Sequence, residues 1–265
     1  MYSPFQLGLR YIKYLIVASN AKGHGIHSPF VFSFITKLLN DDRQFYAYAT
    51  IENLRNLLFI DQHKIVIEDF GAGSRINKHP ERSIADIARS SLKPKKYGQL
   101  LFRMVDQYKP KNVLELGTSL GITTSYLASA IESTSIVTME GSTTIAQVAR
   151  NNFNKLGLKD IKLVEGNFDL TLDSTIKEMG TIDFAFIDGN HRYDPTIRYF
   201  RKLLPVMNEY SVLIFDDIHW SKEMEQAWQE IVLDPLVTLS IDLFFIGIVF
   251  FREEQKVKQN FVIRF

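Results

Sequence analysis

Three aspartates and a histidine stand where they could bind a metal ion and move a proton. Asp216 and Asp217 end the apolar run SVLIFDD, and Asp188 ends the earlier run IDFAFID. Like charges brought together raise one another's pKa, and a divalent cation removes that conflict. Because hard cations prefer oxygen ligands, we expect these three aspartates to hold Mg²⁺ or another divalent cation. The plainer alternative is that Asp216 caps the following helix and Asp217 pairs with a lysine.

His191 follows Asp188 by three residues and is suited to accept a proton. An imidazole with an unperturbed pKa of about 6.5 is largely neutral near pH 7, as a general base must be. We therefore predict a catalytic role for His191 beside Asp188. The alternative is a structural role, in which His191 bonds to Asp194 or to a carbonyl.

Other histidines admit two interpretations each. His219 and Trp220 directly follow the aspartate pair, so they either line an acceptor pocket or pack in the ordinary way. His24 and His27 lie in the stretch HGIHSPF. That stretch is either a lid or acceptor contact, or a turn with solvated histidines before a helix that begins at Pro29.

Two glycine turns could hold a cofactor, EDFGAGS at 68–74 and LELGTSLG at 114–121. In an open parallel sheet, ligands bind beyond the carboxyl ends of the strands. The second turn is followed by a helical segment and then by a strand that ends in Glu140, about twenty residues on, where an acid can bind a ribose. After the first turn, Pro80 and several charges interrupt the expected helix. We therefore choose the second turn and treat GAGS as a nearby loop, a lid or a linker.

The chosen turn favours S-adenosylmethionine over a dinucleotide. It has only Gly117 and Gly121, whereas a dinucleotide fingerprint has a third glycine that admits the pyrophosphate. Glu115, just before the turn, disfavours an anion and favours an ammonium group. S-adenosylmethionine carries an amino-acid moiety and no phosphate, so a nicotinamide oxidoreductase is the weaker alternative.

The elements that must position these residues alternate along the chain from residue 111. Short apolar runs are separated by segments long enough for helices, which predicts a parallel sheet covered on both faces. We expect an α/β, Rossmann-like, doubly wound sheet of seven strands, mostly parallel with an antiparallel last strand. Two late strands, near 238–251 and 260–265, would form a hairpin.

The amino-terminal part of the chain predicts helices. Apolar residues recur at helical spacing over 5–18, 29–39 and 41–58, and KIVIEDF is a short apolar run. Further helices are expected at 81–90 and 97–108. We divide the chain into a mainly helical extension or lid at 1–95, with a role in substrate selection, and a cofactor-binding domain at 96–265.

Composition narrows the class of protein. Lys and Arg total 31 against 30 Asp and Glu, so we expect neither a nucleic acid nor a membrane as partner. The cluster Lys93, Lys95 and Lys96 is expected in a solvated loop. There is no cysteine, which excludes disulfides and thiolate metal sites. The start of the chain lacks a secretory signal, and the apolar stretch at 241–251 is short for a spanning helix. We expect a cytoplasmic protein with a small-molecule acceptor, able to form a homo-oligomer.

Six segments in order carry a resemblance to a known family: YGQLLFRMV, NVLELGTSLGITTSYLA, IVTMEG, KLVEGN, IDFAFIDGNHRYD and SVLIFDDIHW. Over residues 96–265 the chain resembles class I S-adenosylmethionine-dependent methyltransferases. It is most similar to the small-molecule O-methyltransferases of the catechol, caffeoyl-coenzyme A and macrocin types. Residues 1–95 share no such resemblance.

The resemblance implies a role for each matching residue. Glu140 would bind the ribose, Asn167 would meet the adenine amine, and Gln99 would lie in a helix that closes over the cofactor. Asp188 would serve both cofactor and metal, with His191 as base. Metal-dependent relatives have Asp, Asp and Asn at the metal, so Asp217 adds a negative charge here. The residues implied at the methionine part of the cofactor are Glu115, Gly117, Thr118, Ser119 and Gly121.

The expected function is transfer of a methyl group to a hydroxyl of a small molecule, assisted by a divalent cation and a histidine base. Two alternatives remain open. One is a metal-independent methyltransferase that acts on another nucleophile, and the other is a non-catalytic cofactor-binding protein.

Overall fold

The computed structural model describes residues 1–67 and 81–265, and the packing divides the chain into two compact units. The first unit joins residues 1–42 to residues 181–265, and the second consists of residues 43–180. The stretch GAGS, for which we predicted a loop near the site, lies outside the described residues. The domain boundary at residue 95 stays a prediction, since these units are defined by packing alone.

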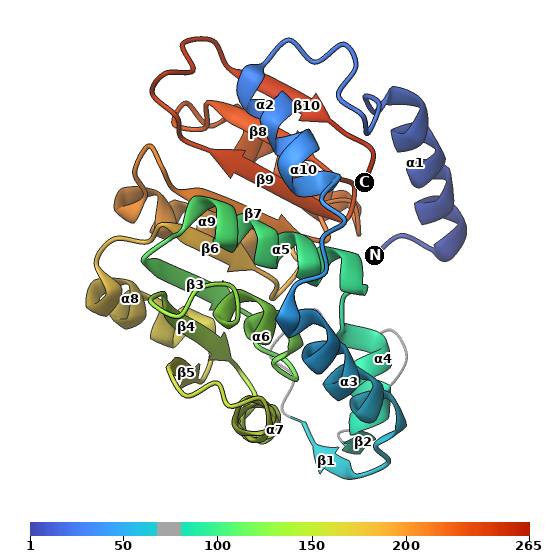
Figure 1. Ribbon diagram of the computed structural model, residues 1–265, viewed down its shortest axis with the longest axis vertical. Coiled ribbons are helices and arrows are strands. Elements are labelled where there is room, and N and C mark those ends of the chain that lie inside the picture. The colour runs from blue at the N-terminus through green and yellow to red at the C-terminus, as the bar shows by residue number, and fades with distance from the viewer. Residues whose placement is uncertain (68–80) are drawn as a thin grey trace. The chain divides into compact units, whose positions relative to one another are not determined.

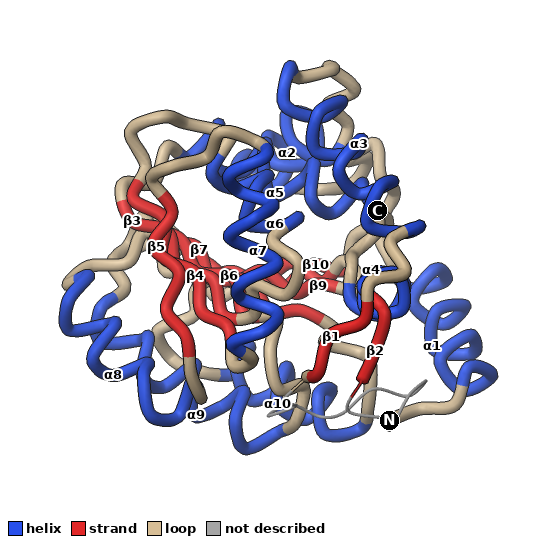
Figure 2. The backbone as a smooth tube through the Cα atoms, turned by 90° about the horizontal axis from the view of Figure 1, so that it is seen from below, coloured by secondary structure: helices blue, strands red, loops and turns tan. Residues whose placement is uncertain are grey.

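Three parallel strands form the sheet of the second unit, in the order β3-β4-β5. Their apolar runs were predicted as strands, and the interiors of β3 and β4 are buried. Figure 2 shows α6 and α7 on one face of these strands and α8 on the other. The elements are β3 (Asn112–Leu116), α6 (Ile122–Ala128), β4 (Ser135–Glu140), α7 (Thr143–Lys155), β5 (Ile161–Glu165) and α8 (Phe168–Met179).

In the same unit, helices that precede the strand β3 in the sequence form a packed layer. Side chains of Tyr48, Ile51, Phe102 and Tyr126 meet in one buried cluster, so α3, α5 and α6 pack together. The predicted helix at 81–90 begins three residues later than expected, because Glu81–Ser83 pairs with Lys64–Val66 as a small antiparallel sheet. These elements are α3 (Tyr46–Ile60), β1 (Lys64–Val66), β2 (Glu81–Ser83), α4 (Ile84–Ser91) and α5 (Lys95–Tyr108).

Five strands of the main sheet belong to the first unit, in the order β10-β8-β9-β7-β6. β6 and β7 are parallel and fully buried, so they read in the sequence as continuous apolar runs. The elements are β6 (Phe184–Ile187), α9 (Tyr193–Leu203), the short 3₁₀ helix η2 (Leu204–Val206), β7 (Val212–Asp216), α10 (Lys222–Leu233), β8 (Leu239–Asp242), β9 (Ile246–Phe250) and β10 (Gln259–Val262).

The last strands differ from the predicted hairpin. The run at 238–251 contains two strands, β8 and β9, which pair with each other antiparallel, while β10 pairs parallel with β8. Phe244, with φ 69°, turns the chain between β8 and β9. The main sheet therefore has eight strands among the described residues rather than seven, and its antiparallel strand is β9. The mostly parallel α/β class is confirmed.

The first 40 residues form helices that belong to the first unit (Figure 1). Helix α1 (Pro4–Val17) begins with a capping box in which Ser3 and Gln6 bond to each other's backbone N–H. Its inner face packs on Phe244. Helix α2 (Pro29–Phe34) is capped by Ser28 and continues as the π-helical turn η1 (Ile35–Leu39). Among the described residues, none of the helices has the length and apolarity needed to cross a membrane.

Candidate functional site

Asp188, His191 and Asp216 come together in the first unit. β6 and β7 are neighbouring parallel strands, with Ile187 opposite Phe215, so the residues at their carboxyl ends lie side by side. One ligand atom from each of the three side chains lies within 4.8 Å of the others. His191 Nε2 is 3.5 Å from Asp188 Oδ1. Asp216 is buried, while Asp188 and His191 are partly exposed and so within reach of a bound molecule.

The donor set of this cluster fits a divalent cation. Two carboxylates supply the hard oxygens that Mg²⁺ prefers, and an imidazole nitrogen also suits ions such as Mn²⁺. Burial of Asp216 at 1% exposure makes its charge costly beside a second carboxylate, and a cation would offset that cost. The prediction that Asp188 and Asp216 bind a metal ion therefore has a geometric basis, although the third member of the cluster is His191.

Asp217 is not part of this cluster. Its backbone has φ 54°, a left-handed conformation that aspartate tolerates better than most residues. The Asp217 N–H donates to the carbonyl of Phe245 at 2.6 Å, and its carbonyl accepts from the Trp220 N–H at 2.9 Å. Asp216 does not cap the next helix, because the Ser221 side chain does so by accepting from the Met224 N–H. Metal binding by Asp217 stays a prediction.

His219 lies between two carboxylates. Its Nε2 is 2.8 Å from Asp242 Oδ2, its Nδ1 is 3.2 Å from Glu225 Oε1, and its ring stacks on Phe244. Burial by itself would lower the pKa of His219, but the hydrogen bonds to Asp242 and Glu225 outweigh it and raise the pKa to about 9. The ring is thus a cation near neutrality with both nitrogens occupied. A role in lining an acceptor pocket stays a prediction for His219 and Trp220.

The chosen glycine turn in the second unit is built from left-handed residues. Gly117 has φ 109°, Ser119 has φ 48° and Gly121 has φ 81°. The N–H groups of Gly117 and Thr118 both donate to the carbonyl of Met139 at 3.0 Å, which ties the turn to the end of β4. A Cβ on Gly121 would lie 2.6 Å from the Phe153 ring, so this position requires glycine for space as well as for conformation.

Glu140 stands at the carboxyl end of β4, beside that turn. Its Oε2 accepts from the Ser119 N–H and its Oε1 from the Ser142 N–H, each at 2.9 Å. These two bonds fix the orientation of the carboxylate. This environment is suited to the predicted contacts with ribose hydroxyls.

Glu115 has a different environment from the one we expected. It has no exposed surface, and its Oε2 accepts hydrogen bonds from the hydroxyls of Thr124 and Thr138. Burial raises the pKa of Glu115 to about 7. Solvent does not reach this carboxylate. Its hydrogen bonds connect β3, which carries Glu115, to β4 and α6. Its predicted contact with an ammonium group remains untested.

The remaining predicted cofactor residues, Asn167 and Gln99, lie on helices of the second unit. Asn167 is the N-cap of α8, and its Oδ1 accepts from the Asp169 N–H at 2.9 Å. Gln99 lies in α5, where its backbone carbonyl accepts from the Tyr48 hydroxyl at 3.3 Å. Their proposed contacts with the adenine and with the closed cofactor site stay predictions.

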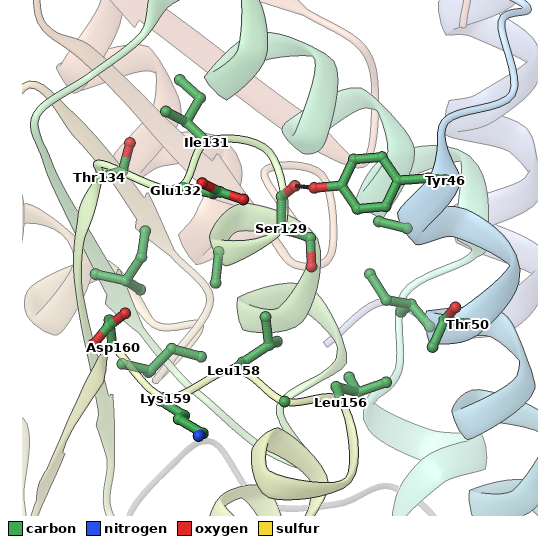
Figure 3. A pocket seen from close by; sticks show the side chains of 16 residues that line it. Tyr46, Thr50, Ser129, Ile131, Glu132, Thr134, Leu156, Leu158, Lys159 and Asp160 are labelled. Carbon is green, nitrogen blue, oxygen red and sulfur yellow. Dashed lines mark hydrogen bonds between the residues drawn. The ribbon is translucent and has the colours of Figure 1, made fainter.

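A pocket of about 680 Å³ lies elsewhere in the second unit, at the amino-terminal ends of β4 and β5 (Figure 3). Its wall includes Tyr46, whose hydroxyl donates to the carbonyl of Ser129. None of the predicted cofactor residues lines it, as expected for the edge of the sheet opposite the carboxyl ends. His24 and His27, in the first unit, are exposed, which favours the solvated-turn interpretation of HGIHSPF.

Part of the chain is similar in sequence to known methyltransferases. Residues 114–218 match the family model described as a methyltransferase domain. A catechol O-methyltransferase from Niastella koreensis is 28% identical over 124 residues, which are 46% of this chain and 55% of that protein. The chain therefore spans about half the length of this curated relative.

Solved structures share the fold at low sequence identity. A SAH-bound methyltransferase from Podospora anserina has a TM-score of 0.60 at 15% identity, over 96% of this chain and 98% of the other. An O-methyltransferase from Bacillus cereus in complex with SAH has a TM-score of 0.56 at 20% identity, over 83% and 97%. The chain therefore shares the fold of these methyltransferases, and its residues 114–218 match a methyltransferase domain.

Proposed function

We propose that this protein transfers the methyl group of S-adenosylmethionine to a hydroxyl oxygen of a small molecule. The observation that carries the proposal is the cluster of Asp188, His191 and Asp216 at the carboxyl ends of β6 and β7. Ligands of open α/β sheets bind at such ends. The named relatives, a catechol O-methyltransferase and an O-methyltransferase bound to SAH, support the choice of oxygen as the acceptor atom.

The methyl donor would bind at the glycine turn of the second unit. Glu140, oriented by two backbone N–H groups, would accept hydrogen bonds from the ribose. The backbone from Gly117 to Gly121 would border the methionine part, with Asn167 toward the adenine and Gln99 on the covering helix. When bound, the donor supplies a sulfonium carbon that is open to attack.

The acceptor would bind at the aspartate cluster of the first unit. Asp188 and Asp216 would hold a divalent cation, which when bound would lower the pKa of a hydroxyl beside it. His191 would accept the hydroxyl proton at a ring nitrogen. The acceptor oxygen then forms a bond to the methyl carbon as the carbon–sulfur bond breaks. The products are the methyl ether, S-adenosylhomocysteine and a proton on His191.

The test measures S-adenosylhomocysteine formation over a panel of hydroxylated compounds that includes catechol. His191→Asn should lower kcat about a hundredfold to ten-thousandfold, the usual contribution of a general base. Asp188→Asn and Asp216→Asn should lower activity and weaken its dependence on added Mg²⁺. Asp194→Asn is the matched control, because Asp194 is exposed in the first turn of α9 and lies outside the cluster. It should leave the rate within about twofold.

The same experiment separates the alternatives. Full activity after chelation of divalent cations would favour a metal-independent methyltransferase acting on another nucleophile. Binding of S-adenosylhomocysteine without turnover of any compound, unchanged by His191→Asn, would favour a non-catalytic binding protein. If the residual activity of His191→Asn needs a higher Mg²⁺ concentration than the activity of the unchanged protein, His191 is a metal ligand instead of the base.

A further inference from the structure

Helix α1 has an apolar stripe on its outer side. Phe5, Leu9, Ile12 and Ile16 are 75%, 53%, 56% and 76% exposed. Steps of four, three and four residues place these side chains on one face of a helix. Contiguous exposed apolar surface of this kind is unusual in a water-soluble protein and marks an interaction surface.

The stripe is separate from the face that attaches α1 to its own unit. Tyr14 and Ala18 are buried against Phe244, with Leu7, Tyr11 and Leu15 packed around them. These residues project from the opposite part of the helix circumference. The outer stripe is therefore a second apolar face, which the fold of the first unit does not use.

Polar contacts fix the orientation of α1 within the first unit. Near its amino-terminal end, the Tyr2 hydroxyl and Arg10 Nη1 both donate to Glu225, each at 2.7 Å. Near its carboxyl-terminal end, the Tyr14 hydroxyl donates to the carbonyl of Ile263. Because α1 is held at both ends, it presents the stripe outward without further rearrangement.

The charged residues of the segment that contains the stripe are all basic. Residues 1–40 contain Arg10, Lys13, Lys22 and Lys37 and no acidic residue. Lys13 is exposed and follows Ile12 directly, at the edge of the stripe. We expected no membrane partner from the net charge of +1 of the whole chain. That value does not reveal the excess of basic residues in residues 1–40. An apolar stripe with a basic residue at its edge fits the interface of an anionic bilayer.

We propose that α1 binds the surface of an anionic phospholipid bilayer. Phe5, Leu9, Ile12 and Ile16 would enter the boundary between headgroups and acyl chains, and Lys13 would lie among the lipid phosphates. A second copy of the chain is the less favourable occupant, because pairing two stripes would bring together two acid-free segments of like charge. The proposal does not depend on the methyltransferase reaction.

The test is co-sedimentation of the full chain with vesicles of phosphatidylcholine, with and without phosphatidylglycerol. We expect binding to the anionic vesicles that weakens as salt is added. Leu9→Glu should reduce the partition coefficient at least about tenfold, since a charge replaces an inserted side chain. Lys13→Gln should reduce it about fivefold, the share of one basic residue near a charged surface.

Leu170→Glu is the matched control. Leu170 is an exposed leucine, at 81%, on α8 of the second unit, so the change in net charge is the same as for Leu9→Glu. The control should bind vesicles like the unchanged protein. Equal loss in both variants, or no binding of the unchanged protein to anionic vesicles, would overturn the proposal. A dimer in light scattering that Leu9→Glu dissociates would also overturn it and assign the stripe to a subunit interface.

Discussion

His191 and His219 look alike in the sequence, since each follows an aspartate at the end of an apolar strand. The fold distinguishes them. The two side chains are about equally exposed, at 22% and 21%, but His191 Nε2 lies 3.5 Å from Asp188 Oδ1, whereas both ring nitrogens of His219 contact carboxylates. The sequence could not predict this difference, because Asp242 lies 23 residues further along the chain and reaches His219 only through the pairing of β8. This difference supports His191, and not His219, as the base in the proposed reaction.

Asp188 and Asp216 could be expected close together because both follow buried parallel strands that are neighbours in the sheet, and the structure brings them together. The sequence could not separate Asp217 from this cluster, since strand ends predict a location and not a side-chain direction. The same limit applies to Glu115. Its type and position suggested a ligand contact, while its hydroxyl partners, Thr124 and Thr138, lie on other elements.

Glu115 gives a residue-scale prediction. Its pKa rises from 4.5 to about 7 on folding, so the folded state becomes less stable as the pH increases through this window. Glu115→Gln removes this titration. Between these two pH values, the free energy of unfolding of the variant should rise by up to about 3 kcal/mol relative to that of the unchanged protein. Urea unfolding over a pH series measures the difference, and two parallel pH profiles would contradict the prediction.

At the scale of elements, continuous apolar runs predicted most strands of the main sheet. The exception is the run at 238–251, where a turn interrupts an apolar sequence with no glycine or proline at Leu243–Phe245. Phe244 takes the left-handed conformation there and remains buried. Turn prediction relies on residues that favour positive φ, and phenylalanine is not one of them. The predicted hairpin between 238–251 and 260–265 was therefore wrong, and the antiparallel pair is β8 and β9.

The turn between β3 and α6 gives an element-scale prediction. Gly121 and Gly157 have similar positive φ, 81° and 71°, but only the Cβ of a Gly121→Ala variant would meet a neighbour. Gly157→Ala should cost about 1 kcal/mol of the free energy of unfolding for backbone strain. Gly121→Ala should cost a further 1–3 kcal/mol or so, because the Phe153 ring must move. Denaturant unfolding of both variants checks this, and equal losses would contradict it.

Attachment of α1 gives a second prediction at this scale. Glu225 on α10 accepts hydrogen bonds from Tyr2 and Arg10 and contacts His219. Glu225→Gln should lower the free energy of unfolding by about 1–3 kcal/mol, as expected when charged hydrogen bonds in a partly buried site are lost. Glu223→Gln, an exposed position in the same helix turn, is the control and should change it by less than about 0.5 kcal/mol.

At the scale of the whole molecule, the proposed function predicts which nucleotide-like ligand stabilises the protein. S-adenosylhomocysteine at about 100 times its Kd should add about 2.7 kcal/mol to the folded state. In a chain of this size that energy should raise Tm by several degrees. NAD should leave Tm unchanged, because the turn at Gly117–Gly121 lacks the third glycine of a dinucleotide site. Differential scanning fluorimetry measures both, and a larger shift with NAD would contradict the proposal.

The first unit joins the two ends of the chain, since the Tyr14 hydroxyl bonds to the carbonyl of a residue 249 positions later. During synthesis, α1 leaves the ribosome more than 200 residues before its partners Glu225, Phe244 and Ile263. Domains generally fold as their residues emerge from the ribosome, so residues 43–180 can fold before the packing partners of α1 have been synthesised. Until β8, β9 and β10 are translated, both apolar faces of α1 are open to chaperones, so this helix needs protection during most of the synthesis of residues 1–265.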